Sequence, residues 1–312
     1  VEAYRISELL QVPVLFRTTT RVNHARGAVE LRKAFAPTRK GRFEKDPQRF
    51  VPVPANARLL RVEQLKRMER ALRMSEGSTL NFVTGSSRVG VVTSGVTYTY
   101  AKEWLQDVEI LKLGFTNPVP EDKVRRFLEG KQRVVVLEEL EPYLEDEVRR
   151  IAQQYNIHVE VLGKHTKHLP RAFEFSPDLI ISLSSILKVR EEKKPLPPPS
   201  IRLPSRPPVL CAGCPHRATY YAVKKAVGKD GAIYSSDIGC YTLGVQPPMQ
   251  TVDYVLCMGA SVGAAGGFSE ATDQKVVSFI GDSTFFHAAM PALINAAFNR
   301  HKFTLVILDN RT

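Results

Sequence analysis

Short apolar runs alternate with helical stripes of apolar residues between residues 88 and about 187. Four runs have the length and β-branched composition of buried strands, at 89–93, 108–113, 133–137 and 157–161. Helical spacing between them predicts helices near 98–106, 122–128 and 144–155. A regular alternation of strands and helices is typical of a doubly wound parallel sheet, so this stretch is expected to form one.

A second alternation begins near Val209. A helix is expected at 217–227 and a strand at 232–236, followed by a passage of small residues from 259 to 267. Two more strands are expected at 275–280 and 303–309, with a helix between them that Pro291 can open. The pattern therefore predicts an α/β protein with several domains, built on doubly wound parallel sheets.

The first part of the chain is patterned less regularly. Residues 12–16 are strand-like. Apolar residues then recur at helical spacing up to Gly77, and they are Leu59, Val62, Leu65, Met68 and Leu72. This stripe predicts a helix whose apolar side packs either in a core or against a partner.

Shifts in composition divide the chain at residues 1–36, 37–77, 78–187, 188–208 and 209–312. The fourth stretch holds seven prolines among charged residues, and such a density excludes a helix or a central strand, so a semi-rigid linker is expected there. The chain begins at Val1 rather than Met and stops two residues after Asn310. We therefore expect it to be part of a longer polypeptide.

The chain has 312 residues, of which 43% are hydrophobic and 24% charged, and this composition is that of a globular protein rather than a disordered one. It contains no apolar run long enough to cross a membrane and no signal peptide, and its C-x-x-C thiols favour a reducing cytoplasm. The net charge is +12, and seven basic residues crowd the stretch from Arg32 to Arg49. This run is either a solvated connector or a surface that recruits an acidic partner; the sequence holds no recognised nucleic-acid module.

One pair of strand ends carries metal-binding chemistry. Gly281, Asp282 and Ser283 follow the apolar strand 275–280, and Asn310 closes the strand 303–309. If the two strands are parallel neighbours, the Asp and Asn side chains lie at the same edge of the sheet, where such sheets bind ligands. Their oxygens suit a Mg²⁺ ion that keeps its other positions for phosphate and water. The alternative is an ordinary turn with a surface Asp.

The cysteines suggest a second site. Cys211 and Cys214 form a C-x-x-C followed by Pro215 and His216, and Cys240 lies 26 residues further on. Thiolates at such positions can bind an iron–sulfur cluster, line a pocket as reduced thiols, or form a zinc site or disulfide. Cys257 lies in an apolar stretch and is expected in the core.

These motifs together resemble the 2-oxoacid:ferredoxin oxidoreductases, and among them the alpha subunits of the indolepyruvate type. The resemblance rests on the segments 211–217, 237–244 and 258–267 and on Gly281-Asp282-Ser283 with Asn310. It implies a fold of the thiamine-diphosphate enzyme type, with Mg²⁺ held by Asp282, Asn310 and the main-chain carbonyl of Thr312. It also implies that Cys211, Cys214 and Cys240 hold a [4Fe–4S] cluster. Ser283 replaces the family's usual third glycine.

The resemblance also implies the remaining site residues. The cofactor is expected to contact Asp237, Ile238, Gly239, Cys240, Gly259, Ala260, Ser261, Gly281, Asp282, Ser283 and Asn310. His216 is either a proton carrier or a structural residue. Residues 1–36 would end a pyrimidine-binding domain, 78–187 would form a domain related to the transketolase C-terminal domain, and 209–312 would be the thiamine domain. The activating carboxylate would lie outside this chain, so the chain alone is expected to be inactive.

The implied reaction is the oxidative decarboxylation of an aryl 2-oxoacid such as indolepyruvate to acyl-CoA. The implied partners are a beta subunit, ferredoxin, coenzyme A and the 2-oxoacid, in a hetero-oligomer without nucleic acid or membrane. A non-oxidative decarboxylase or synthase, or a non-catalytic subunit with a vestigial site, remains an alternative. Glu138, Glu139 and Glu141 follow a strand end, and there a structural role, as acids in a first helical turn, is favoured over a catalytic pair. A structural turn is likewise favoured for the stretch 93–97.

Overall fold

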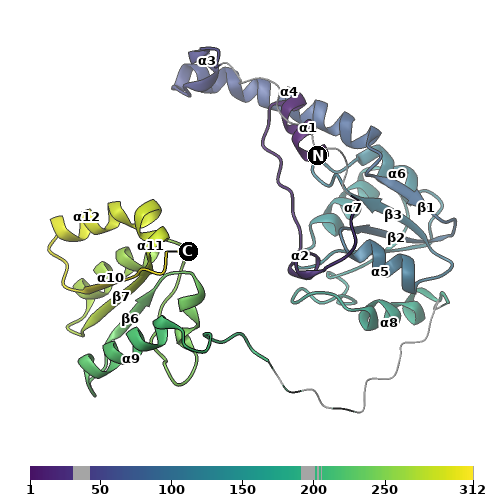
Figure 1. Cartoon of the computed structure of the whole chain (residues 1–312). Coiled ribbons are helices and arrows are strands. Elements are labelled where there is room, and N and C mark those ends of the chain that lie inside the picture. The colour runs from purple at the N-terminus through teal and green to yellow at the C-terminus, as the bar shows by residue number, and fades with distance from the viewer. Residues whose placement is uncertain (31–42, 191–200, 202–203, 205, 312) are drawn as a thin grey trace. The chain divides into compact units, whose positions relative to one another are not determined.

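The described residues form two separate sheets, one of five strands and one of three. A computed structural model describes residues 1–30, 43–190, 201, 204 and 206–311. The sheets belong to two compact units, Val1–Pro198 and Pro199–Thr312 (Figure 1). The basic run from Arg32 to Arg49 and the proline-rich stretch 188–208 lie in large part outside the described residues.

The sheet of the first unit has the strand order β1-β3-β2-β4-β5. The strands are β1 (Phe82–Thr84), β2 (Val89–Ser94), β3 (Glu109–Leu113), β4 (Arg133–Leu137) and β5 (Glu160–Leu162). Strands β2 to β5 pair in parallel, and β1 pairs antiparallel with β3. The predicted parallel sheet is confirmed, and the short antiparallel edge strand was not predicted.

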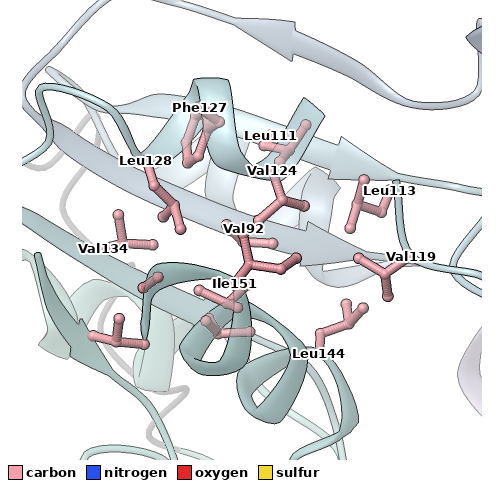
Figure 2. Packing of buried hydrophobic residues seen from close by; sticks show 14 residues of the cluster. Val92, Leu111, Leu113, Val119, Val124, Phe127, Leu128, Val134, Leu144 and Ile151 are labelled. Atoms are coloured by element: carbon pink, nitrogen blue, oxygen red, sulfur yellow. The ribbon is translucent and has the colours of Figure 1, made fainter. Parts of the chain in front are cut away.

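Helices cover both faces of this sheet because alternate residues of its buried strands point to opposite sides. Val92, Leu111 and Val134 pack against α6 (Glu121–Leu128) and α7 (Tyr143–Gln154), as Figure 2 shows. Their neighbours Val91 and Ile110 pack on the other face, in a cluster that includes residues of α5 (Thr97–Trp104) and α8 (Pro177–Leu187). The doubly wound arrangement is thus present, with three of its helices as predicted and α8 in addition.

One predicted strand is present with shifted bounds, and another expectation for a strand was wrong. The strand predicted at 157–161 begins only at Glu160, because the preceding segment turns back on α7 and Ile157 N–H donates to the Ala152 carbonyl at 2.8 Å. The strand-like stretch 12–16 forms no strand. A helix, α1 (Glu2–Leu10), precedes it, and Leu15 and Phe16 are 96% and 81% exposed. Pro13 donates no main-chain hydrogen bond, and these side chains gain no core by extending.

The stripe before Gly77 is helical, as predicted. It belongs to α4 (Pro54–Gly77), which follows the short helix α3 (Pro47–Phe50). The carboxyl end of α4 packs on α1 through Ala71 and Met74. Leu59, Val62, Leu65 and Met68 are exposed, so these four residues are not core residues of the described unit. Packing against a partner stays a prediction.

The second unit holds three parallel strands in the order β6-β7-β8. They are β6 (Ile233–Ser236), β7 (Val276–Gly281) and β8 (Thr304–Leu308), close to the predicted bounds. Every residue of β7, the central strand, is buried. One face of the sheet packs on α9 (Pro215–Val227) through Tyr220. The other face packs on α10 (Ala260–Ala271) through Val262, and residues of α12 (Met290–Phe298) pack against the same cluster. Among the described residues, no helix is long and apolar enough to span a bilayer.

Candidate functional site

The carboxyl ends of β7 and β8 lie side by side. The two strands pair in parallel, with Gly281 opposite Leu308. Asp282 follows Gly281 directly, and Asn310 is two residues past Leu308, so the predicted neighbouring positions of the acid and the amide are present. Thr312 lies outside the described residues.

Asp282 also begins a helical segment. Three short elements run on from β7 without a break, namely α11 (Asp282–Thr284), η2 (Phe285–Ala289) and α12. An acidic residue in a first helical turn faces main-chain N–H groups with no partner in the helix, and these groups favour negative charge. Asp282 is half-buried and Ser283 is exposed. The turn therefore combines a hard oxygen ligand with N–H donors suited to a phosphate.

Asp237 lies at the carboxyl end of β6, buried completely. Its carboxylate accepts hydrogen bonds from the main-chain N–H groups of Ile238 at 3.0 Å, Gly259 at 2.9 Å and Ser261 at 3.2 Å. Gly259 has a φ of +87°, and a Cβ there would lie 2.7 Å from the Cβ of Ala288. Asp237 thus holds the turn after β6 against the start of α10, where Ala260 begins the helix.

Two hydroxyl oxygens in this region are buried without a hydrogen-bond partner in the described part of the chain. They belong to Ser261, in the first turn of α10, and to Ser278 on β7. Buried polar groups in native proteins are nearly always bonded, so each of these hydroxyls is suited to bond to a further polar group.

Tyr241 joins the turn after β6 to the turn after β7. It is buried, and its hydroxyl donates to the Ile238 carbonyl at 3.2 Å. Burial raises its pKa, and hydrogen bonds with the Gly281 main chain and the Thr284 side chain oppose part of that shift. The sequence analysis did not single out Tyr241. The signal for it was its place directly after Gly239 and Cys240, in a motif already assigned to the site.

His216 lies beside Tyr241. It is the second residue of α9, it is buried, and its ring meets the Tyr241 ring edge to face, with centroids 5.9 Å apart. Burial lowers the pKa of His216, so its imidazole is neutral at neutral pH. A neutral, buried imidazole packed on an aromatic ring fits a structural role for His216. It also fits a proton carrier, because a neutral imidazole can accept a proton, so both interpretations stay predictions.

The four cysteines are free thiols. Cys214 packs against the apolar cluster around Tyr220, while Cys211 and Cys240 are exposed. Burial and, to a lesser degree, the nearby Tyr241, Cys240 and Cys214 groups raise the pKa of Tyr220, so Cys214 and Cys240 lie around the same tyrosine. Within the described ranges, no three His, Cys, Asp or Glu side chains converge closely enough to hold a metal ion.

The expected burial of Cys257 was wrong. Cys257 is exposed, and so are Leu256 and Met258 beside it. The segment forms no regular strand. It meets β6 at a bridge between Tyr254 and Ser235, with a main-chain hydrogen bond from Ser236 to the Tyr254 carbonyl at 2.9 Å. The pairing stops at Tyr254, so the apolar residues that follow it lie at the surface of the described unit.

The acids after β4 have structural roles. The Glu138 carboxylate is buried and accepts hydrogen bonds from the N–H groups of Leu144 at 2.7 Å and Glu145 at 2.8 Å, at the start of α7. Burial raises the pKa of Glu138 and lowers that of the adjacent Lys164, outweighing their mutual attraction. A hollow of about 380 Å³ adjoins these acids. The favoured structural interpretation is confirmed for Glu138, although Glu138 lies before α7 rather than in its first turn.

The turn after β2 is also structural. The hydroxyls of Thr93 and Thr97 lie 2.7 Å apart, and Thr97 also donates to the carbonyls of Ser94 and Leu137. Both threonines are buried. These bonds close the turn between β2 and α5, as the structural interpretation of 93–97 predicted.

Comparisons with known proteins agree with this geometry. The family model "Thiamine pyrophosphate enzyme, C-terminal TPP binding domain" matches residues 237–312. The chain is 47% identical to the indolepyruvate oxidoreductase subunit IorA of Methanothermobacter marburgensis, 45% to that of Methanothermobacter thermautotrophicus and 38% to that of Thermococcus kodakarensis. Each match covers 99% of this chain and 52% of the relative, so the chain spans about half the length of these curated relatives. The chain belongs to the family of the indolepyruvate oxidoreductase IorA subunits.

Proposed function

We propose that the second unit binds the diphosphate end of thiamine diphosphate through a Mg²⁺ ion. The observation that carries this proposal is the parallel register of β7 and β8, with Gly281 opposite Leu308, inside the residues that match a thiamine pyrophosphate-binding family. It brings Asp282 and Asn310 to adjacent strand ends. A crevice outside the carboxyl ends of parallel strands is where open α/β sheets bind ligands.

The side chains present suit that group. The oxygens of Asp282 and Asn310 are hard ligands that Mg²⁺ prefers, and the carbonyl of Thr312 would be the third protein ligand. The start of the helical segment at Asp282 offers main-chain N–H groups to a phosphate. The buried, unbonded hydroxyl of Ser261 adds a donor beside α10.

The other residues would position the cofactor rather than react. Gly281 and Ser283 would approach the diphosphate with their main chain, and Ile238, Gly239, Cys240, Gly259 and Ala260 would line the thiazolium side. Asp237 would act through the main chain, because its oxygens already accept from three N–H groups. Thiamine diphosphate, when bound, supplies the nucleophilic carbon and electron sink for decarboxylation of a 2-oxoacid. His216, neutral and buried, could hold or accept a proton beside Tyr241.

The complete enzyme would oxidise an aryl 2-oxoacid, such as indolepyruvate, to acyl-CoA with ferredoxin as electron acceptor. The substrate follows from the printed name of the relatives, which are subunits of an indolepyruvate oxidoreductase. A beta subunit would complete the hetero-oligomer, and the activating carboxylate would come from outside this chain. The four free thiols suit a reducing cytoplasm.

A [4Fe–4S] cluster on Cys211, Cys214 and Cys240 would need the three thiolates to converge. Among the described residues, these three side chains form no such group. Iron and acid-labile sulfide in the complete enzyme, compared with a Cys214→Ser variant, would separate cluster ligands from reduced thiols. If the Cys214→Ser variant contains about four fewer iron atoms per subunit than the wild type, the cysteines are cluster ligands. If the iron content is unchanged, they are reduced thiols.

Calorimetry on the complete subunit, assembled with its partner and freed of cofactor, tests the proposal. Thiamine diphosphate with Mg²⁺ should bind to the wild type, and Asp282→Ala should abolish the heat of binding. Asp273→Ala is the matched control, because Asp273 is an exposed acid at the other end of β7 and should leave binding unchanged. Undiminished binding by Asp282→Ala would refute the assignment of this site.

A further inference from the structure

The ring of Tyr241 packs against two glycines, Gly239 and Gly281, that belong to different turns. A Cβ placed on Gly239 would lie 2.4 Å from Cε1 and 2.9 Å from Cδ1 of the Tyr241 ring. A Cβ placed on Gly281 would lie 3.0 Å from the same Cε1 atom and 3.4 Å from the hydroxyl oxygen. Gly239 follows β6, and Gly281 ends β7. The ring therefore fills the space that side chains at both turns would take.

The backbone does not explain either glycine. Gly239 has a φ of 175° and Gly281 a φ of −73°, and residues with side chains adopt both values. Gly259, by contrast, has a φ of +87° that favours glycine for its backbone alone. The absence of a Cβ at 239 and 281 thus has a packing cause, and the tyrosine ring supplies one.

The ring is also fixed in place. Tyr241 is buried in the apolar cluster with Tyr220 and Phe279, and His216 packs against its edge. Its main-chain carbonyl accepts a hydrogen bond from the Tyr220 hydroxyl at 2.6 Å. Its own hydroxyl donates to the Ile238 carbonyl at 3.2 Å, and the hydroxyl oxygen lies 3.4 Å from where a Cβ on Gly281 would be. A buried ring with these contacts cannot swing away to admit an added methyl group without breaking them.

We propose that Tyr241 is a positioning residue that fixes the spacing between the turn 237–240 and the turn 281–283. This inference rests on the proposed function, in which the first turn lines the thiazolium and the second holds the diphosphate with its metal ion. The two turns follow neighbouring strands, and the pairing of those strands ends where Ser236 lies opposite Phe279. One main-chain hydrogen bond continues it, from the Asp237 N–H to the Phe279 carbonyl at 3.0 Å. Past that bond, the Tyr241 ring lies against both Gly239 and Gly281.

Alanine substitutions at the glycine and the tyrosine, separately and together, test the packing. In the complete, cofactor-free subunit with its partner, Gly239→Ala should lower the melting temperature clearly in the wild-type background. In a Tyr241→Ala background the same substitution should cost little, since the atoms that it meets are gone. An equal loss in both backgrounds would overturn the proposal, because glycine would then be needed for another reason. If Tyr241→Ala fails to fold, Tyr241→Leu replaces it, since Leu lacks the Cε1 atom.

The effect on the cofactor is measured with Tyr241→Phe, which keeps the ring and loses the hydroxyl. Thiamine diphosphate should bind with a Kd raised roughly 3- to 10-fold, which corresponds to one lost hydrogen bond. The matched control is Tyr234→Phe, which removes a hydroxyl from a buried tyrosine of the same cluster and should leave the Kd unchanged. An unchanged Kd in Tyr241→Phe would overturn the proposal alone. A wild type that binds no thiamine diphosphate would overturn the proposed function together with it.

Discussion

Both carboxylate oxygens of Asp237 accept a hydrogen bond from the Gly259 main-chain N–H, each at a distance of 2.9 Å. This contact joins the carboxyl end of β6 to the residue that precedes α10. A carboxylate at a helix start is favoured both by its hydrogen bonds and by the helix dipole. The turn after β6 and the start of α10 therefore form one rigid part of the candidate site.

Asp237→Asn should destabilise the protein by about 1–3 kcal/mol, because an amide nitrogen would face N–H donors and a buried hydrogen bond would be lost. Equilibrium urea unfolding of the complete subunit measures the change. Asp273→Asn, at an exposed acid, serves as the control and should change the free energy of unfolding little. Equal stability of the two variants would contradict the anchoring role of Asp237.

Gly259→Ala should destabilise the protein by at least about 1 kcal/mol, because an alanine in the left-handed region is strained. Its Cβ would also lie 2.7 Å from that of Ala288. Gly267→Ala is the matched control within α10, since a Cβ there meets nothing within 4 Å. It should stabilise by about 0.5–1 kcal/mol, as alanine does in a helix interior. Thermal unfolding of both variants provides the comparison, and a neutral Gly259→Ala would refute this account.

His216 should make stability depend on pH. Burial lowers its folded-state pKa below the ordinary value of 6.5. Below 6.5 the unfolded chain therefore binds a proton that the folded chain does not, and this contribution to stability falls as the pH falls. His216→Phe should remove that decline while keeping an aromatic ring against Tyr241. Melting temperatures on either side of pH 6.5 measure it, and parallel curves for wild type and variant would show that His216 titrates normally.

The strands around the candidate site could be predicted because burial controls their sequence. β7 is buried along its whole length, and the run 275–280 is apolar almost without interruption. Asp282 and Asn310 come just after such runs, so the parallel pairing of β7 and β8 places the two residues at adjacent strand ends. The rule that an apolar run is a buried strand failed at Cys257. The run 254–257 is apolar, but it forms no strand beyond one bridge, and Cys257 is exposed. Local hydrophobicity does not reveal whether a second layer is present to cover a segment.

Contacts between distant turns could not be predicted. The space beside Gly239 and Gly281 is filled by Tyr241, and that relation depends on how β6 and β7 align. Asp237 was assigned to the site from its motif, but its hydrogen bonds to Gly259 and Ser261 depend on where α10 begins. A sequence pattern identifies which residue types are present at the end of a strand. It does not identify which main-chain groups those residues meet.

Among the described strands, β8 lies at the end of the order β6-β7-β8, and this has a consequence for any fragment that ends there. An outermost strand presents main-chain donors and acceptors along one side, and these groups can pair with a strand of another molecule. Ile307 on β8 is 42% exposed, and Ile294 and Phe298 on α12 are exposed as well. Residues 209–312 produced by themselves would therefore be prone to aggregate through this edge, and added lysines there would be the remedy.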